Sequence, residues 1–84
     1  MKVSIFTLKK TLFKDEAQML NVKTLDGELT ILPNHIPLIT ELRPGNIRII
    51  DKNHKESIIA ISSGFLEVNP REIKILCEQY AESN

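Results

Sequence analysis

Few side chains in this sequence have the types and spacing that acid–base, nucleophilic or metal chemistry requires. His35 lies between two prolines, His54 lies in a polar stretch, and there is no third histidine. A histidine acts as a base or a metal ligand only with partners, and no acid–histidine–nucleophile set can be assembled from these residues. We therefore expect a structural or interface role for His35, and we predict no catalytic residue, no metal site and no cofactor.

Other reactive residue types occur without the context that their chemistry needs. Asp26 and Glu28 could form a carboxylate pair, but nothing in the sequence indicates a raised pKa, so a solvated turn is expected. Ser62-Ser63-Gly64 lacks the flanking glycines of a nucleophile elbow. With three glycines in all, the chain has no phosphate-cradling loop of the usual kind. Cys77 lies in an alternating apolar stretch and is expected to be a small core side chain.

Composition narrows the class of protein further. Eleven Lys and Arg balance eleven Asp and Glu, which argues against a general nucleic-acid binder. One cysteine excludes an internal disulfide and a zinc site built on several thiolates. No apolar run reaches the roughly 20 residues of a membrane span, and the N-terminus is too short and too alternating for a signal peptide. Any membrane association is therefore expected to go through a partner.

The elements that position these side chains are predicted to be strands. The chain holds twelve Ile, three Val and five Thr, and β-branched side chains pack well on a pleated surface. Apolar and polar residues alternate over residues 3–7, 46–49, 65–69 and 73–77. Residues 57–62 are apolar at nearly every position, which predicts a central strand covered on both sides.

Turn signals separate the predicted strands. Asp26-Gly27 predicts a tight turn between strands at residues 18–24 and 28–32. Arg43-Pro44-Gly45 predicts a turn with Pro at its second position and Gly at its third. Residues 51–55 are typical of a polar hairpin tip.

Another strand ends at Asn69-Pro70-Arg71. Short strands at this spacing predict an all-β sandwich or barrel, here as one domain over residues 1–84. The last four residues, 81–84, are expected to be frayed or to begin a helix.

Residues 27–40 do not fit a plain sandwich. Pro33 and Pro37 remove two backbone donors and exclude a helix or a central strand. Yet the segment carries six large apolar side chains: Leu29, Ile31, Leu32, Ile36, Leu38 and Ile39. Either the segment closes the core from one end, or it faces a partner. Both interpretations hold if alternate side chains point in different directions.

Two blocks of the sequence resemble a known family. The first reads Asp26-Gly27-Glu28-Leu29-Thr30-Ile31-Leu32-Pro33-Asn34-His35-Ile36-Pro37-Leu38, followed by Arg43-Pro44-Gly45-Asn46-Ile47-Arg48-Ile49. The second is Ser63-Gly64-Phe65-Leu66-Glu67-Val68. Both closely resemble the epsilon subunit of F-type ATP synthases, with the patterns Gly-Glu-Leu-Gly-Ile-hydrophobic-Pro-Gly-His-Ala-Pro-Leu, Lys-Pro-Gly and Gly-Gly-hydrophobic-Leu-Glu-Val.

This chain departs from the family pattern at some of these positions. Asn34 and Ser63 stand where the family usually has Gly, and Ile36 replaces a common Ala. Asn tolerates a left-handed backbone better than most residues, so the turn at position 34 is expected to survive.

The resemblance implies a two-layer β-sandwich of about ten short strands. It also implies a non-catalytic rotor subunit in the central stalk, which couples the gamma subunit to the membrane c-ring so that ion-driven rotation supports ATP synthesis. Such a subunit is peripheral to the membrane, at the cytoplasmic face of the bacterial plasma membrane. Most epsilon subunits continue into a C-terminal helical hairpin that inhibits ATP hydrolysis and in some members senses ATP. These 84 residues do not include that hairpin, so we expect no direct nucleotide binding.

The resemblance also assigns contacts residue by residue. The positions that would face the c-ring are Asp26, Gly27 and Glu28. The positions that would face gamma, with their apolar neighbours, are Thr7, His35, Ile36, Pro37, Leu38 and Thr40. The alternative is a free-standing small β-barrel that binds other proteins, and such a module would leave gamma unbound.

Overall fold

The computed structural model describes residues 1–78 and 80–83, and within these residues it contains strands and no helix. The nine strands are β1 Lys2–Phe6, β2 Thr11–Thr24, β3 Gly27–Ile31, β4 Leu38–Leu42, β5 Gly45–Asp51, β6 Glu56–Ile61, β7 Gly64–Val68, β8 Glu72–Cys77 and β9 Tyr80–Ser83. The all-β prediction is confirmed. In this part of the chain no helical segment has the length and apolar character needed to cross a bilayer.

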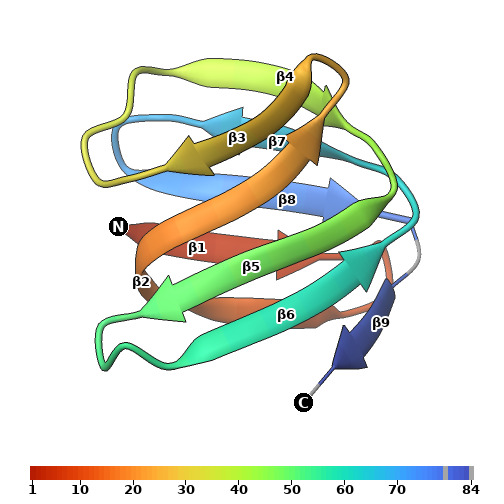
Figure 1. Cartoon of the computed structure of the whole chain (residues 1–84), viewed down its shortest axis with the longest axis horizontal. Helices are drawn as coiled ribbons and strands as arrows, with labels where there is room; N and C mark the ends of the chain where they lie inside the picture. The colour runs from red at the N-terminus through yellow and green to blue at the C-terminus, as the bar shows by residue number, and fades with distance from the viewer. Residues whose placement is uncertain (79, 84) are drawn as a thin grey trace.

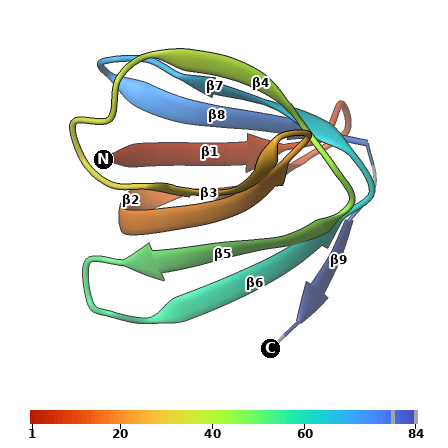
Figure 2. The ribbon, with the colours of Figure 1, turned by 45° about the horizontal axis from the view of Figure 1, so that its top comes forward.

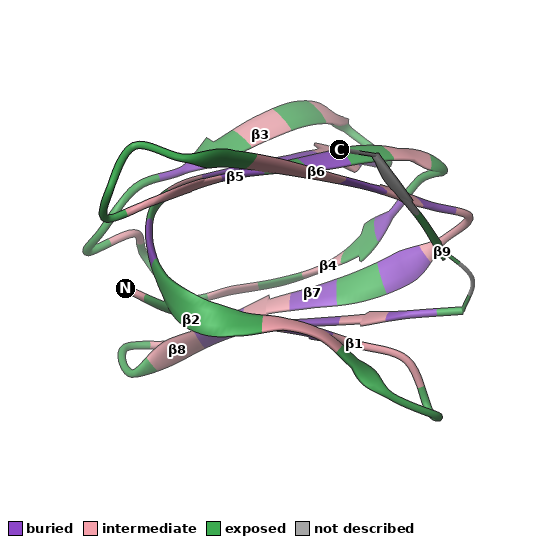
Figure 3. Ribbon diagram, turned by 90° about the horizontal axis from the view of Figure 1, so that it is seen from below, coloured by how far each residue is buried: buried purple, intermediate pink, exposed green. Residues whose placement is uncertain are grey.

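The strands form two facing layers (Figures 1 and 3). Layer A contains the first part of β2, then β1, β8, β7 and β4, and layer B contains β3, the second part of β2, β5, β6 and β9. Only β1 and β8 pair in parallel among these neighbours. The two-layer β-sandwich predicted from the sequence is therefore the observed architecture.

One long strand joins the layers. In β2, residues 11–16 pair with β1, whereas residues 20–24 pair with β3. The pairing of β2 with β5 shifts register between Ala17 and Met19, and the strand curves from one layer into the other (Figures 1 and 2). The strand predicted at residues 18–24 is thus the second part of a longer element. Because β2 serves both layers, nine strands occupy ten strand positions.

The core lies between the inner faces of the two layers. Its buried residues are Val3, Ile5, Ala17, Leu20, Val22, Ile31, Leu42, Ile47, Ile49, Ile59, Ile61, Leu66, Val68, Ile73, Ile75 and Cys77. Burying each of the larger side chains stabilises the fold by about 1.5–3 kcal/mol. Cys77 is part of this core, as predicted, and burial raises the pKa of its thiol. That thiol therefore stays protonated and unreactive.

Both predicted hairpins are present, but the loop of the first lies one residue earlier than the predicted Asp26-Gly27. Leu25 and Asp26 form a two-residue loop, and Gly27 begins β3 with a φ of 119° that favours glycine. At the β5–β6 turn, the Asp51 carboxylate accepts hydrogen bonds from the backbone N–H groups of Asn53 and Lys55. These side-chain bonds satisfy donors that a tight turn leaves without a strand partner.

Three sequence predictions need correction. In the predicted Arg43-Pro44-Gly45 turn, residues 43 and 44 form a corner that carries the chain from β4 in layer A to β5 in layer B, and Gly45 is already the first residue of β5. Strand β6 is buried on its inner face only, because Ile58 and Ala60 face outward and are half-buried. Residues 81–83 are neither frayed nor helical, since they belong to β9, which pairs with β6. Asn84 lies outside the described residues.

Candidate partner-binding surfaces

The β2–β3 hairpin presents the predicted c-ring residues at one end of β3. Asp26 and Glu28 are exposed, and Gly27 between them is half-buried. The Thr24 hydroxyl closes the loop, since it donates to the Gly27 carbonyl at 2.8 Å and accepts from the Asp26 N–H at 3.1 Å. The structure therefore brings the three predicted residues together at the loop end of the hairpin, with Asp26 in the loop and Gly27 and Glu28 at the start of β3.

The carboxylate of Glu28 has a local partner. Lys23 Nζ lies 3.1 Å from Glu28 Oε2, on the directly opposite residue of β2. The hydrogen bond and the charge of Lys23, with a smaller contribution from Asn21, lower the pKa of Glu28. Glu28 is thus ionised, and the solvated role predicted for it agrees with a side chain that remains 58% exposed.

The segment between β3 and β4, residues 32–37, forms what we call the lip (Figure 2). Ile31 before the lip is buried and Leu38 after it is half-buried, so both flanks of the lip anchor in the core. Within the lip, Leu32 and Ile36 are exposed, Ile36 by 74%. The residues that flank the lip therefore pack in or against the core, while its own apolar side chains point outward. That they face a partner stays a prediction.

The lip turns at Asn34, whose φ of 70° lies in the left-handed region. This confirms that asparagine can support the turn where the family usually has glycine. His35 follows, half-buried, with Nδ1 2.7 Å from the Ile36 carbonyl oxygen. The ring therefore donates from Nδ1 to the backbone of the next residue, which fixes its position within the lip.

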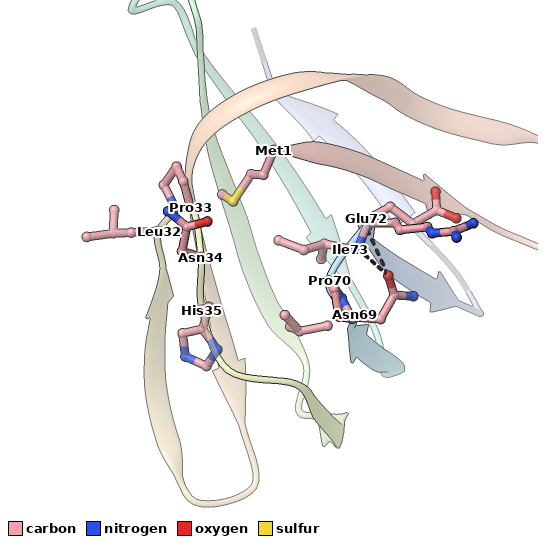
Figure 4. Close-up of a pocket in the computed structure, with 11 residues that line it drawn as sticks. Met1, Leu32, Pro33, Asn34, His35, Asn69, Pro70, Glu72 and Ile73 are labelled. Carbon is pink, nitrogen blue, oxygen red and sulfur yellow. Dashed lines mark hydrogen bonds between the residues drawn. The ribbon is translucent and has the colours of Figure 1, made fainter.

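A cavity of about 390 Å³ separates the lip from the β7–β8 turn (Figure 4). His35, Asn34 and Pro33 line one side, and Asn69 and Pro70 line the other. The Asn69 side chain is already engaged, because its Oδ1 accepts from the backbone N–H groups that follow it. Over the described residues, no three His, Cys, Asp or Glu side chains are grouped as metal ligands. The cavity thus offers hydrogen-bonding groups without the constellation that catalysis requires.

The six residues predicted to face gamma do not form one patch. His35, Ile36, Pro37 and Leu38 lie together at the lip, whereas Thr7 lies in the β1–β2 loop at the far end of layer A, because β1 runs parallel to β8 and away from the lip. The Thr7 Oγ1 accepts hydrogen bonds from the backbone N–H groups of Lys9 and Lys10, so this side chain stabilises the β1–β2 turn.

Thr40 also differs from the other predicted gamma residues. It is half-buried and sits opposite Leu66, so it belongs to the inward register of β4. The side chain of its neighbour Ile39 points outward.

Sequence reasoning missed the outer face of layer A. Ile39 is 76% exposed on β4 and Phe65 is 58% exposed on β7. Phe65, Leu76 and Phe6 follow one another across β7, β8 and β1 in register, and a cavity of about 570 Å³ lies beside Phe65 and Leu76. The alternation of Ile39 with Leu38 and of Phe65 with Leu66 contained the signal. The alternation predicts that Ile39 and Phe65 point away from the core, but it does not predict which other exposed side chains lie near them.

The chain is thus a two-layer β-sandwich domain with an ionised hairpin tip, an outward apolar lip and exposed apolar side chains on one outer face. Residues 1–83 match the sequence model described as the ATP synthase delta/epsilon chain, β-sandwich domain. The chain belongs to this family.

Named relatives agree with the family. The chain is 35% identical over 81 residues to the ATP synthase epsilon chain of Alkalilimnicola ehrlichii, covering 96% of this chain and 58% of that protein. It is 41% identical over 76 residues to the epsilon chain of Chloroflexus aggregans, covering 90% and 54%. The chain thus spans little more than half the length of these relatives.

Solved structures agree with the fold. A chain of the Euglena gracilis mitochondrial ATP synthase, in a structure of OSCP, F1 and c-ring, superposes with a TM-score of 0.88 at 22% identity, covering 95% of this chain and 51% of that one. A chain of the Tetrahymena thermophila mitochondrial ATP synthase central stalk and c-ring gives 0.80 at 20% identity, covering 96% and 65%. At these identities the likeness concerns the fold.

Proposed function

We propose that this sandwich is a rotor component of an F-type ATP synthase, which binds the gamma subunit on one surface and the c-ring on another. The observation that carries the proposal is the division of its exposed residues. Apolar side chains gather at the lip and on layer A, whereas the β2–β3 hairpin at the other end of β3 presents the carboxylates of Asp26 and Glu28 beside a single exposed apolar side chain, Leu25. Two unlike surfaces at separate places suit a part that connects two different partners.

The gamma surface in this proposal is the lip together with the outer face of layer A. Ile36 and Ile39 lie on either side of the junction between the lip and β4, so the two regions are continuous along the chain. His35 and Phe65 extend this surface on either side of them. Its apolar centre would supply most of the binding free energy, as in other interfaces.

The ring surface is the hairpin tip with Asp26, Gly27 and Glu28. Its exposed, ionised side chains would set register and orientation by hydrogen bonds and charge, more than affinity. The close-packed core between the two surfaces deforms little, and it would transmit torque from one partner to the other.

In this role the chain performs no chemistry, and the coupling ion would pass through the membrane ring. The chain would be peripheral, bound at the cytoplasmic face of a bacterial plasma membrane only through the complex. Direct binding of nucleotide by these residues is not expected, and a calorimetric titration with ATP that gave heat at micromolar concentrations would contradict this part of the proposal.

The test is reconstitution with purified gamma and c-ring. We expect the chain to co-elute with gamma alone, and the gamma-bound chain to bind the c-ring. A matched pair of variants separates the surfaces, since Ile36→Asp should abolish gamma binding while Asp26→Asn leaves it unchanged. A chain that binds neither partner would instead be a free-standing interaction module.

A further inference from the structure

We propose that Lys23 is a positioning residue for the hairpin carboxylate, and that Gly45 on the neighbouring strand provides the space in which the Lys23 side chain lies. Together they fix Glu28 in one orientation at the hairpin. The consequence for c-ring binding rests on the proposed function, whereas the positioning itself is a property of this chain.

The contacts run in a line along the outer face of layer B. Lys23 Nζ lies 3.1 Å from Glu28 Oε2 and 3.4 Å from Asn21 Oδ1. Asn21, which is buried although it faces outward, donates from Nδ2 to the Thr30 hydroxyl at 2.9 Å. A buried amide bonded on both sides is a fixed point. Lys23 is thus held between a rigid acceptor and the Glu28 carboxylate.

Gly45 has a packing reason to lack a side chain. A Cβ built at this position would lie 2.9 Å from Lys23 Cγ, closer than two carbon atoms approach, but 3.6 Å from Lys23 Cβ. The backbone here is tied together as well, because the Arg43 N–H donates to the Lys23 carbonyl at 2.9 Å. The lysine stem therefore passes directly over the glycine, and a side chain at position 45 would displace it.

The other strong pair on this face does not compete for these groups. Arg48 on β5 donates from Nε to Glu56 Oε2 on β6 at 3.0 Å, so the guanidinium is directed toward β6 and away from β2, which carries Lys23. Arg48 contributes only a weak charge effect at Glu28. The orientation of Glu28 is therefore set chiefly by Lys23.

A partner that meets the hairpin would encounter a carboxylate that already has a cation beside it. The net charge of such a pair is close to zero, and the carboxylate can accept further hydrogen bonds only from certain directions. We infer that Glu28 receives hydrogen bonds from the partner in a fixed direction, and that binding at this site depends little on ionic strength.

The first experiment tests the packing of Lys23 over Gly45 without any partner. Denaturant midpoints are measured for wild type, Gly45→Ala, Lys23→Ala and the double variant. We expect Gly45→Ala to lower the midpoint less in the Lys23→Ala background, because the clash with Cγ is then absent. Any backbone cost at position 45 is common to both backgrounds and cancels. Additive shifts would overturn the proposal.

The second experiment measures the carboxylate. The Glu28 carboxyl is titrated by carbon-13 NMR in wild type, Lys23→Met and Lys23→Arg. We expect Lys23→Met to raise the pKa of Glu28 toward its ordinary value of 4.5 and Lys23→Arg to keep it low. Lys52→Met, in the β5–β6 turn, is the matched control and should leave this pKa unchanged. An unchanged pKa in Lys23→Met would overturn the proposal.

The third experiment links positioning to the ring. The affinity of the gamma-bound chain for purified c-ring is compared for Lys23→Met, Glu28→Gln and the double variant. We expect each single change to weaken binding by about two- to fivefold, and the double variant to be no weaker than Glu28→Gln. Additive losses would show that Lys23 acts by itself and would overturn the proposal. If Glu28→Gln binds like wild type, the ring contact of the proposed function fails instead, while the first two experiments still decide the positioning.

Discussion

The two layers have similar inner faces and very different outer faces. On layer B, charged side chains find partners within the chain, Lys23 with Glu28 and Arg48 with Glu56. On layer A, Lys74 pairs with Glu72, but Ile39 and Phe65 are apolar side chains that remain 76% and 58% exposed. Removing apolar surface from water is favourable, whereas a charge that is already paired within the chain contributes little when it meets a partner. The comparison indicates that layer A is the face with more to gain from a partner.

The largest effect should come from the core that both faces share. Leu66→Ala should lower the free energy of unfolding by about 2–5 kcal/mol, because Leu66 is fully buried and its loss leaves a cavity. The free energy of unfolding of a domain of this size is roughly 4–13 kcal/mol. A loss of this size would therefore destabilise the fold that supports both outer faces. The measurement is denaturant unfolding. Phe65→Ser, one residue away but outward, is the control, and equal losses for both variants would contradict the assigned register.

Next in size is a change that should affect layer A alone. Phe65→Asp places a charge in the centre of the apolar row and should weaken gamma binding by about 30-fold or more, as truncation of interface anchors does. Its effect on stability should stay within about 0.5 kcal/mol, as for other surface changes. A titration against purified gamma measures the first and denaturant unfolding the second. Unchanged affinity would remove the outer face of layer A from the gamma surface.

A smaller loss of gamma binding is expected at the lip. His35→Asp puts a carboxylate next to the apolar Ile36, where His35 now bonds to a backbone carbonyl. The dissociation constant for gamma should rise, but less than for Phe65→Asp, because His35 is at the polar margin of the surface. His54→Asp on the β5–β6 turn is the matched control. If both histidine variants bind gamma equally well, the lip is not part of the interface.

The charged outer face of layer B is tested at the β2–β3 hairpin. Glu28→Lys places two cations opposite each other, at positions 23 and 28, and should weaken coupling to the c-ring without unfolding the domain. Proton pumping by reconstituted vesicles measures the coupling, and a circular dichroism melt checks the fold. Gamma binding should be retained, which separates this variant from those on layer A. Normal pumping would count against the ring contact.

Alternation and turn residues predicted most of this fold, and their limits are physical. Period-two patterns place Leu66 inward and Phe65 outward, because side chains on a strand alternate between faces. They do not show that Phe65, Leu76 and Phe6 follow one another across β7, β8 and β1, since that depends on which strands pair. The bend of β2 near Ala17 has no glycine or proline to mark it. The role of Gly45 also arises only in the folded chain, where Lys23 from a different strand crosses it.

The smallest expected effect is the pH dependence of the Lys23–Glu28 pair. The folded-state pKa of Glu28 lies below its ordinary value of 4.5, so the pair stabilises the fold fully above that value. The stabilisation is lost as the pH falls through the lowered folded-state pKa and the carboxylate is protonated. The stability difference between wild type and Glu28→Gln should thus be constant near neutral pH and shrink in acid. Denaturant midpoints across this range measure it, and added salt should reduce the difference because the pair is exposed. If the stability difference persists unchanged in acid, charge pairing between Lys23 and Glu28 is not its source. The outer face of layer B would then not differ from that of layer A in the way described above.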